Sequence, residues 1–451
     1  MCNTAISQEL PCSGDIQSKW VINDPVQFQA FSEAIKCTGE FDVEWNGRFI
    51  VDKTIQVSGG TVLNVTGADT NGNTFIDGGN SVQIFSVVNS ELNLKDITLM
   101  NGNGTDGGAI SAKSSKLSLV NTRFVSNNGQ NGGAMYISNK STVYCSGSSF
   151  TNNTASYGGG MFMEEMSEAS CGGSWTGNSA VQYGGAVSIS KSSLEWKKET
   201  IFESNIAGDF GGAVFSFNDS TVSWNTNVIF YLNEAFIGGA MCIFESSFSG
   251  DGTTSFYSNR GNIGGGVGTR NSNIYMGGQT VFRHNSADEG GAIFSLNTTV
   301  RFSGYSLFEF NNANFGGGLD MDESTLSWEG QFEMIGNNGF DFAGAINSRN
   351  STVSCSESIT TFVDNYGRLS GGAIRVDSSN ISLRGVTTFF KNEVNESDHG
   401  VGGALDIIDS IVYWEGVMGI YNNTGTAIVF SLRNYPGKGT LRLNTTCRVI
   451  V

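Results

Sequence analysis

A motif of two glycines, a small residue and an aliphatic residue returns twelve times in this chain of 451 residues. Successive copies lie 25 to 31 residues apart, and one copy has Ala as its first residue. The copies begin at Gly107, Gly132, Gly158, Gly184, Gly211, Gly238, Gly264, Gly290, Gly316, Ala343, Gly371 and Gly402. A fixed period of this size is typical of a solenoid, because each repeat forms a coil that cannot bury its apolar face alone.

Each coil shows three strand-like segments. Apolar and polar residues alternate after the glycines, as in residues 135–138, and this period of two predicts a strand with one buried face. A second segment has the pattern Ser-x-aliphatic-x-large, as in residues 220–224, and a third carries Phe-x-x-Asn, as in residues 256–259. No segment between the glycine pairs shows the apolar stripe of a helix. We therefore predict an all-β, right-handed, single-stranded parallel β-helix of about 15 coils.

Stacked coils would place like residues over one another. Each Phe should then lie on the Phe of the next coil, and each Asn should sit at a turn, where its side-chain amide bonds the next coil. The Gly-Gly corner would let the chain turn with positive φ. The asparagines expected in this structural ladder are Asn127, Asn153, Asn205, Asn233, Asn259, Asn285, Asn311 and Asn365.

Gly-Gly-Ala-Ile and Phe-x-x-Asn occur together in one period, and this combination resembles the repeats of the chlamydial polymorphic outer membrane proteins. Related repeats also occur in extracellular proteins of other bacteria and of eukaryotes. The resemblance covers roughly residues 92–428. It implies a pectin-lyase-like β-helix that is exposed at the cell surface and has an adhesive or structural function.

The two ends differ from the repeats. Residues 1–40 are predicted to form a cap with a short helix, since Asp24 can be the N-cap and Pro25 the first helical residue. Such a helix would shield the open end of the core. Residues 41–106 should form coils that lack the Gly-Gly corner, and residues 107–430 the repeats. Residues 431–451 read as a terminal strand without an evident cap, through which chains could self-associate.

Composition limits the partners and the compartment. A formal charge of −17 argues against nucleic-acid binding. With two histidines and no Cys-x-x-Cys, we expect no metal or other cofactor, and no apolar run is long enough for a transmembrane helix. Cys145 and Cys171 hold the same strand position one coil apart, so they are either a disulfide or two small buried side chains. Cysteines at positions 2, 12 and 37 suggest a stapled cap outside the cytosol.

One outward column, directly after the aliphatic position of the motif, holds the candidate site residues. A cluster that acts on acidic polysaccharides or binds calcium could be formed by Asp320, Arg375 and Asp406. The same residues could instead form a solvated ladder of paired charges. The Asp-Asp, Gly-His-Gly and Arg-Ile-Lys motifs of pectin-cleaving hydrolases are absent. Earlier in the column, aromatic residues could bind sugar rings or a partner if exposed, or could be covered by a flanking loop. These residues are Tyr136, Phe162, Phe215 and Phe294.

The expected function follows from uniform repeats without a convincing catalytic cluster. We expect a secreted or cell-surface, non-catalytic adhesin or structural domain whose partner is a glycan or a component of the cell surface or wall. The alternative is a polysaccharide lyase or hydrolase that acts near Asp320, Arg375 and Asp406.

Overall fold

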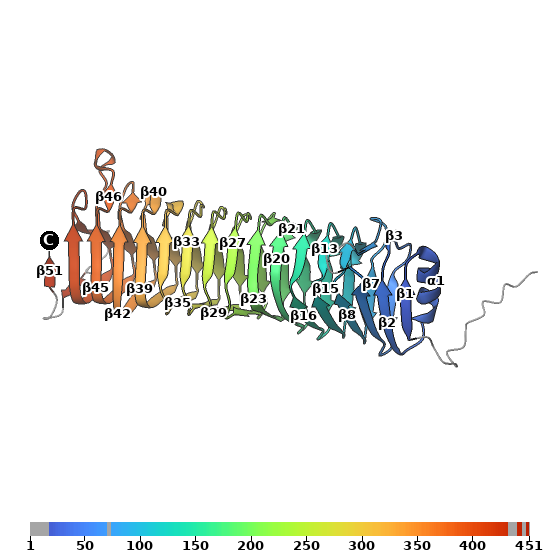
Figure 1. Cartoon of the computed structure of the whole chain (residues 1–451). Helices are drawn as coiled ribbons and strands as arrows, with labels where there is room; N and C mark the ends of the chain where they lie inside the picture. Colours follow the sequence, from blue (N-terminus) through green and yellow to red (C-terminus); the bar gives the residue numbers. More distant parts are fainter. Residues whose placement is uncertain (1–17, 70–73, 432–439, 444–447, 451) are drawn as a thin grey trace, which may run out of the picture.

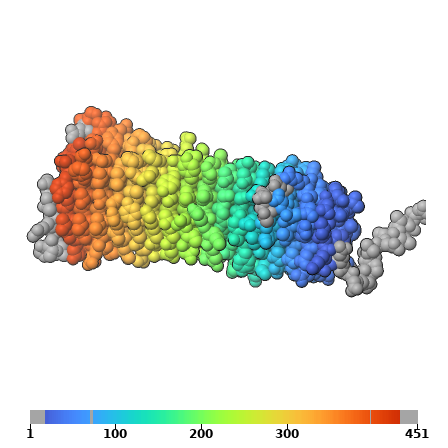
Figure 2. All heavy atoms as spheres, viewed as in Figure 1, coloured from blue at the N-terminus to red at the C-terminus, as the bar shows by residue number. Residues whose placement is uncertain are grey.

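Consecutive coils stack directly on one another in a parallel β-solenoid of about 16 turns. The computed structural model describes residues 18–69, 74–431, 440–443 and 448–450. Figure 1 shows an elongated rod in which the strands cross the long axis, with the helix α1 (Pro25–Ala34) at one end. Figure 2 shows the same rod as a continuous cylinder. The predicted all-β solenoid with one short N-terminal helix is confirmed.

The coils build two continuous parallel sheets, called A and B, and an interrupted third one, called C. Sheet B takes the strand that follows the glycines, sheet A takes the next two segments, and sheet C takes the short segment before the next glycine pair. Sheet B consists of β4 (Ile55–Ser58), β7 (Phe85–Val88), β11 (Ile110–Lys113), β15 (Met135–Ser138), β19 (Met161–Met163), β22 (Val187–Ser190), β25 (Val214–Phe217), β28 (Met241–Phe244), β31 (Val267–Arg270), β34 (Ile293–Leu296), β38 (Leu319–Asp322), β41 (Ile346–Arg349), β44 (Ile374–Asp377), β47 (Leu405–Ile408) and β49 (Ile428–Ser431).

The two other sheets complete the coils. Sheet A consists of β1 (Lys19–Ile22), β2 (Glu40–Trp45), β3 (Arg48–Ile50), β5 (Val62–Gly67), β6 (Phe75–Asp77), β8 (Glu91–Lys95), β9 (Thr98–Met100), β12 (Lys116–Val120), β13 (Arg123–Val125), β16 (Thr142–Ser146), β17 (Ser148–Thr151), β20 (Glu168–Thr176), β23 (Ser193–Glu203), β26 (Thr221–Trp224), β27 (Val228–Tyr231), β29 (Ser247–Gly250), β30 (Thr254–Tyr257), β32 (Asn273–Met276), β33 (Thr280–Arg283), β35 (Thr299–Phe302), β36 (Ser306–Glu309), β39 (Thr325–Ile335), β42 (Thr352–Val363), β45 (Asn380–Phe390), β48 (Ile411–Tyr421), β50 (Thr440–Leu443) and β51 (Arg448–Ile450). Sheet C has two groups of strands. The first is β10 (Asn103–Asp106), β14 (Asn128–Asn131), β18 (Thr154–Tyr157), β21 (Ser179–Tyr183) and β24 (Ile206–Ala207), and the second is β37 (Asn312–Phe315), β40 (Asn338–Phe342), β43 (Tyr366–Gly367) and β46 (Glu393–Val394). Isolated β-bridges join the coils between the two groups. A 3₁₀ turn, η1 (Glu396–Asp398), follows β46.

Aromatic rings form a column inside the rod. Ring centroids lie 5.0 Å apart between Phe202 and Phe230, 4.8 Å apart between Phe230 and Phe256, and 4.5 Å apart between Phe256 and Phe282. The rings stack because the strands that carry them pair in register, residue for residue. All four side chains are fully buried. The predicted aromatic column is therefore present.

The asparagine of each Phe-x-x-Asn segment bonds the next coil from a buried turn. Asn259 Nδ2 donates to Asn285 Oδ1 at 3.0 Å and to the carbonyl of Phe230 at 3.1 Å. Its Oδ1 accepts from both the backbone N–H and Nδ2 of Asn233, each at 3.0 Å. In the described part of the chain this ladder runs unbroken from Asn127. It contains the eight expected asparagines together with Asn178, Asn337, Asn392 and Asn423.

A second buried ladder, not predicted from the sequence, joins the serines that begin the Ser-x-aliphatic segments. The backbone N–H of Ser220 donates to Ser246 Oγ at 3.2 Å, and the N–H of Ser246 donates to Ser272 Oγ at 3.3 Å. Ser220 Oγ itself donates to the carbonyl of Phe217 at 2.7 Å. A hydroxyl that both accepts and donates satisfies buried backbone groups at this corner, which explains why serine recurs.

The Gly-Gly corner leaves little room for side chains. Gly238 adopts φ of +66°, and a Cβ added to Gly239 would lie 2.2 Å from the carbonyl oxygen of Gly265 in the next coil. Positive φ favours glycine at the first position, where Ala343 with φ of +54° is the one variant, and the close approach of two coils requires glycine at the second.

Helix α1 covers the N-terminal end of the core, as expected. Asp24 is its N-cap, since the backbone N–H of Gln27 donates to Asp24 Oδ1 at 2.9 Å, and Pro25 is its first residue. Buried Phe28 packs against the core, with its ring centroid 6.0 Å from that of Trp45. The helix thus shields apolar side chains that would otherwise face water.

Two cysteines that share a strand position are covalently joined. Cys145 on β16 and Cys171 on β20 form a disulfide, with their Cα atoms 4.3 Å apart. Cys37 is disulfide-bonded as well. Cys2 and Cys12 of the expected staple lie outside the described residues.

The C-terminal segment that we expected as a terminal strand, residues 431–451, lies in part outside the described residues. Within it, β50 and β51 both pair with β48. Self-association through this end stays a prediction.

Replacing one ring of the aromatic column should destabilise the rod strongly. Phe230→Ala removes stacking with two neighbouring rings and leaves a cavity, so the free energy of unfolding should fall by about 3–5 kcal/mol. Tyr231→Ala is the matched control, because Tyr231 lies on the same strand, points outward and is 40% exposed. Urea denaturation followed by circular dichroism measures both; equal losses would contradict the column as the source of stability.

Candidate functional site

The outward column of sheet B, which follows the aliphatic position of the motif, is buried. Tyr136, Phe162 and Phe215 are only 6%, 8% and 3% exposed, and Phe294 is half-buried. The sequence left open whether these residues are exposed for sugar rings or a partner, or are covered by a flanking loop. Their burial matches the second alternative, because another segment of the coil lies over them.

The side chain just before each glycine pair supplies the cover, and these side chains together are called the covering column. The ring of Tyr183 lies 5.2 Å from that of Phe215, and the ring of Phe210 lies 5.3 Å from it. Where the outward position is Gly268, a Cβ would lie 2.7 Å from Ile237 Cγ2. The alternation of a strand indicates which side of the sheet a residue faces, but not what packs on that side.

The carboxylates and the arginine of the candidate site lie in the same column. Strand register places Asp320 beside Asn347, Asn347 beside Arg375, and Arg375 beside Asp406. Asp320 is 0% exposed, Arg375 6% and Asp406 2%. Phe342 of the covering column lies over Arg375, with the guanidinium carbon 4.8 Å from the ring centroid. The expectation that these charged side chains face solvent is wrong, because all three are buried.

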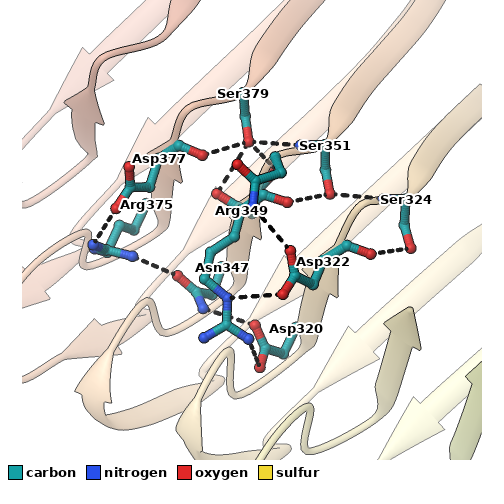
Figure 3. Close-up of polar contacts among 11 residues, drawn as sticks. Asp320, Asp322, Ser324, Asn347, Arg349, Ser351, Arg375, Asp377 and Ser379 are labelled. Atoms are coloured by element: carbon teal, nitrogen blue, oxygen red, sulfur yellow. Dashed lines mark hydrogen bonds and ion pairs between the residues drawn. The ribbon is translucent and has the colours of Figure 1, made fainter. Parts of the chain in front are cut away.

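Figure 3 shows how the polar side chains bond to one another. Asn347 Nδ2 donates to Asp320 Oδ1 at 2.7 Å, and Arg349 Nη2 donates to Asp320 Oδ2 at 3.4 Å. Arg375 Nη1 donates to Asn347 Oδ1 at 3.2 Å, and its Nη2 donates to Asp377 Oδ2 at 3.1 Å. Both oxygens of Asp320 and both terminal nitrogens of Arg375 therefore have partners within the rod, as buried charges require.

Arg349 was not predicted as a member of this cluster. The signal was available, because Arg349 follows Asn347 by two residues on β41 and so faces the same side of sheet B. Its Nε also lies 3.9 Å from Asp322 Oδ2. Arg349 thus holds two carboxylates of the neighbouring coil.

Burial raises the pKa of Asp320 to about 7. The positive charge of Arg349 and the hydrogen bond from Asn347 oppose this rise, whereas the negative charges of Glu289 and Asp322 add to it. A carboxyl with a pKa near neutrality matches the requirement for a general base. The side chain of Asp320 is nevertheless 0% exposed, so this arrangement offers a substrate no access to it.

Three further observations bear on function. Among residues 18–69, 74–431 and the two short described C-terminal segments, no group of three or more His, Cys, Asp or Glu residues could hold a metal ion. The described residues also include no helix with the length and apolar character needed to cross a bilayer. Comparison of the chain with protein-family models, curated proteins and solved structures finds no match.

Asp320→Asn should remove part of the pH dependence of stability. The pKa of Asp320 rises from an ordinary 3.8 to about 7 in the folded protein, which therefore keeps a proton that the unfolded chain releases between these values. The stability that this proton confers is present below about pH 4 and is lost as the pH rises to about 7. The variant should match the wild type near pH 4 and exceed its unfolding free energy by about 1–3 kcal/mol near pH 8, as measured by urea denaturation.

Glu199→Gln is the control for this experiment, because Glu199 is an exposed carboxylate on β23 of sheet A and lies outside the Asp320 cluster. Its difference from the wild type should change little with pH. A difference between Asp320→Asn and the wild type that is the same at both pH values would contradict the interpretation of a buried, neutral carboxyl.

Proposed function

We propose that this chain is a secreted or cell-surface, non-catalytic rod that works as an adhesin or structural domain. One observation carries the proposal: the best candidates for catalysis, Asp320, Arg375 and Asp406, are all buried, and Phe342 of the covering column lies over Arg375. An enzyme must bring its acid, base and cationic groups into contact with a substrate.

The repeats support a surface location. Gly-Gly-Ala-Ile and Phe-x-x-Asn within one period resemble the repeats of the chlamydial polymorphic outer membrane proteins, and the parallel β-solenoid is consistent with a pectin-lyase-like β-helix. The disulfide between Cys145 and Cys171 favours an oxidising compartment outside the cytosol. The acidic net charge of −17 makes a glycan, cell-surface or wall component a better partner than a nucleic acid.

A screen for polysaccharide cleavage tests the non-catalytic part of the proposal. The purified chain is incubated with acidic polysaccharides, and new reducing ends and unsaturated products are measured. We expect no product with either the wild type or Arg375→Ala. Product formation by the wild type that Arg375→Ala abolishes would overturn the proposal in favour of a lyase or hydrolase.

Labelling of intact cells tests the location. Antibodies raised against the rod should bind cells of the source organism that have not been permeabilised, or should detect the chain in the medium. Label that appears only after permeabilisation would refute a secreted or surface-exposed protein.

A further inference from the structure

A cleft of about 580 Å³ opens on the outer side of sheet B in the first coils. One wall is the outward side of β7 and β11, where Ser86, Val88 and Ser111 line the cleft. The opposite wall is made by β10 and residues 81–83, which include Gln83. In the proposed function no role has been given to this part of the rod.

The cleft continues the channel that aromatic rings fill in later coils. Strand register carries the outward column from Ser86 through Ser111 to Tyr136, its first ring. In the same coils the covering column holds Asp106 and Asn131, which are short and polar. Where both columns carry rings, the channel is packed solid; where both carry small polar residues, it stays open to solvent.

An ion pair between Lys113 and Asp106 lies at one end of the cleft. Lys113 Nζ lies 3.0 Å from Asp106 Oδ2, and Asn131 Nδ2 donates to Asp106 Oδ1 at 2.9 Å. Lys113 Nζ also lies 5.2 Å from the centroid of the Tyr136 ring. Burial raises the pKa of Asp106, but hydrogen bonds from Asn131 and Lys113 and the charge of Lys113 outweigh it and hold the pKa below its ordinary value. A carboxylate and an ammonium group are therefore held in fixed positions.

We propose that this cleft binds one or two sugar units of a neutral glycan, an inference that rests on the proposed adhesive function and gives it a site. Hydroxyls, an amide and the fixed ion pair supply the closely spaced donors and acceptors that sugar hydroxyls require. Val82 and Val88 supply apolar surface for the C–H groups of a sugar ring. The volume lies within the range of about 300–1,000 Å³ that small-molecule sites occupy.

The same geometry disfavours other ligands. Asp106 and Lys113 neutralise each other, so the cleft has no excess charge with which to select an anionic chain. An extended peptide cannot add as a strand, because β7 pairs with β4 and β11, and β11 pairs with β7 and β15. Recognition must therefore come from side chains, as it does for a small polyhydroxylated ligand.

Ser111→Tyr tests the site by introducing the side chain that the next coil already carries at the equivalent position. Ser111 pairs in register with Tyr136, so the new ring should fill the cleft without a change of backbone. Ser118→Tyr is the matched control, since Ser118 lies in the same coil on sheet A and pairs with Tyr144. The full chain is screened against neutral oligosaccharides, and the best ligand is titrated by calorimetry. Ser111→Tyr should weaken binding on the order of tenfold or more, whereas Ser118→Tyr should leave it unchanged.

A second variant tests the same cleft at another position, in case Ser111→Tyr disturbs folding. Val88→Trp enlarges a cleft residue that is 37% exposed, and it should weaken the same ligand. Unchanged binding in both variants would overturn the cleft as the site and leave the adhesive function standing. Failure of the wild type to bind any neutral glycan would also overturn the inference, while the surface-labelling experiment tests the proposed function separately.

Discussion

The buried asparagine ladder is the constraint on which the rest of the rod depends. A primary amide has two donors and one oxygen acceptor with two lone pairs, so Asn259 can bond the coil before it, the coil after it and the backbone at once. A buried amide left without partners costs about 1–3 kcal/mol for each group. A coil that slipped by one residue would break every one of these bonds. The ladder therefore fixes the register, and the stacked rings and aliphatic side chains follow from that register.

The sequence repeats made it possible to predict the fold. The period predicted the solenoid, and the recurrence of Phe-x-x-Asn predicted which residues of successive coils would meet. The covering column could not be predicted in the same way, because the residue before the glycines changes character from coil to coil. It is Asn131, Tyr183, Ile237, Glu289 and Phe342 in five of the coils. No pattern indicated that this residue lies over sheet B, so the sequence could not decide whether Phe215 is covered, and it predicted Arg375 to face water.

One channel along sheet B is filled in three different ways. Rings such as Tyr183 and Phe215 pack it in the middle of the rod, where apolar burial stabilises the coils. Toward the C-terminus, Asp320 and Arg375 fill it with a bonded polar cluster. Near the N-terminus it is left unfilled, as a cleft lined by Ser86, Val88 and Ser111. Because the backbone is nearly the same throughout, the chemistry of the surface depends on which side chains occupy this channel rather than on the fold.

The bond between Cys145 and Cys171 has a mechanical consequence, since it spans a sequence separation of 26 residues. In a linear array each coil contacts only its neighbours, so tension applied at the termini peels windings away one after another from an end. A covalent bond between two adjacent windings prevents them from separating at that step. Under load, the short part of the rod before the disulfide and the long part after it would unfold separately. Unfolding that begins in one part would stop at the disulfide before it reached the other.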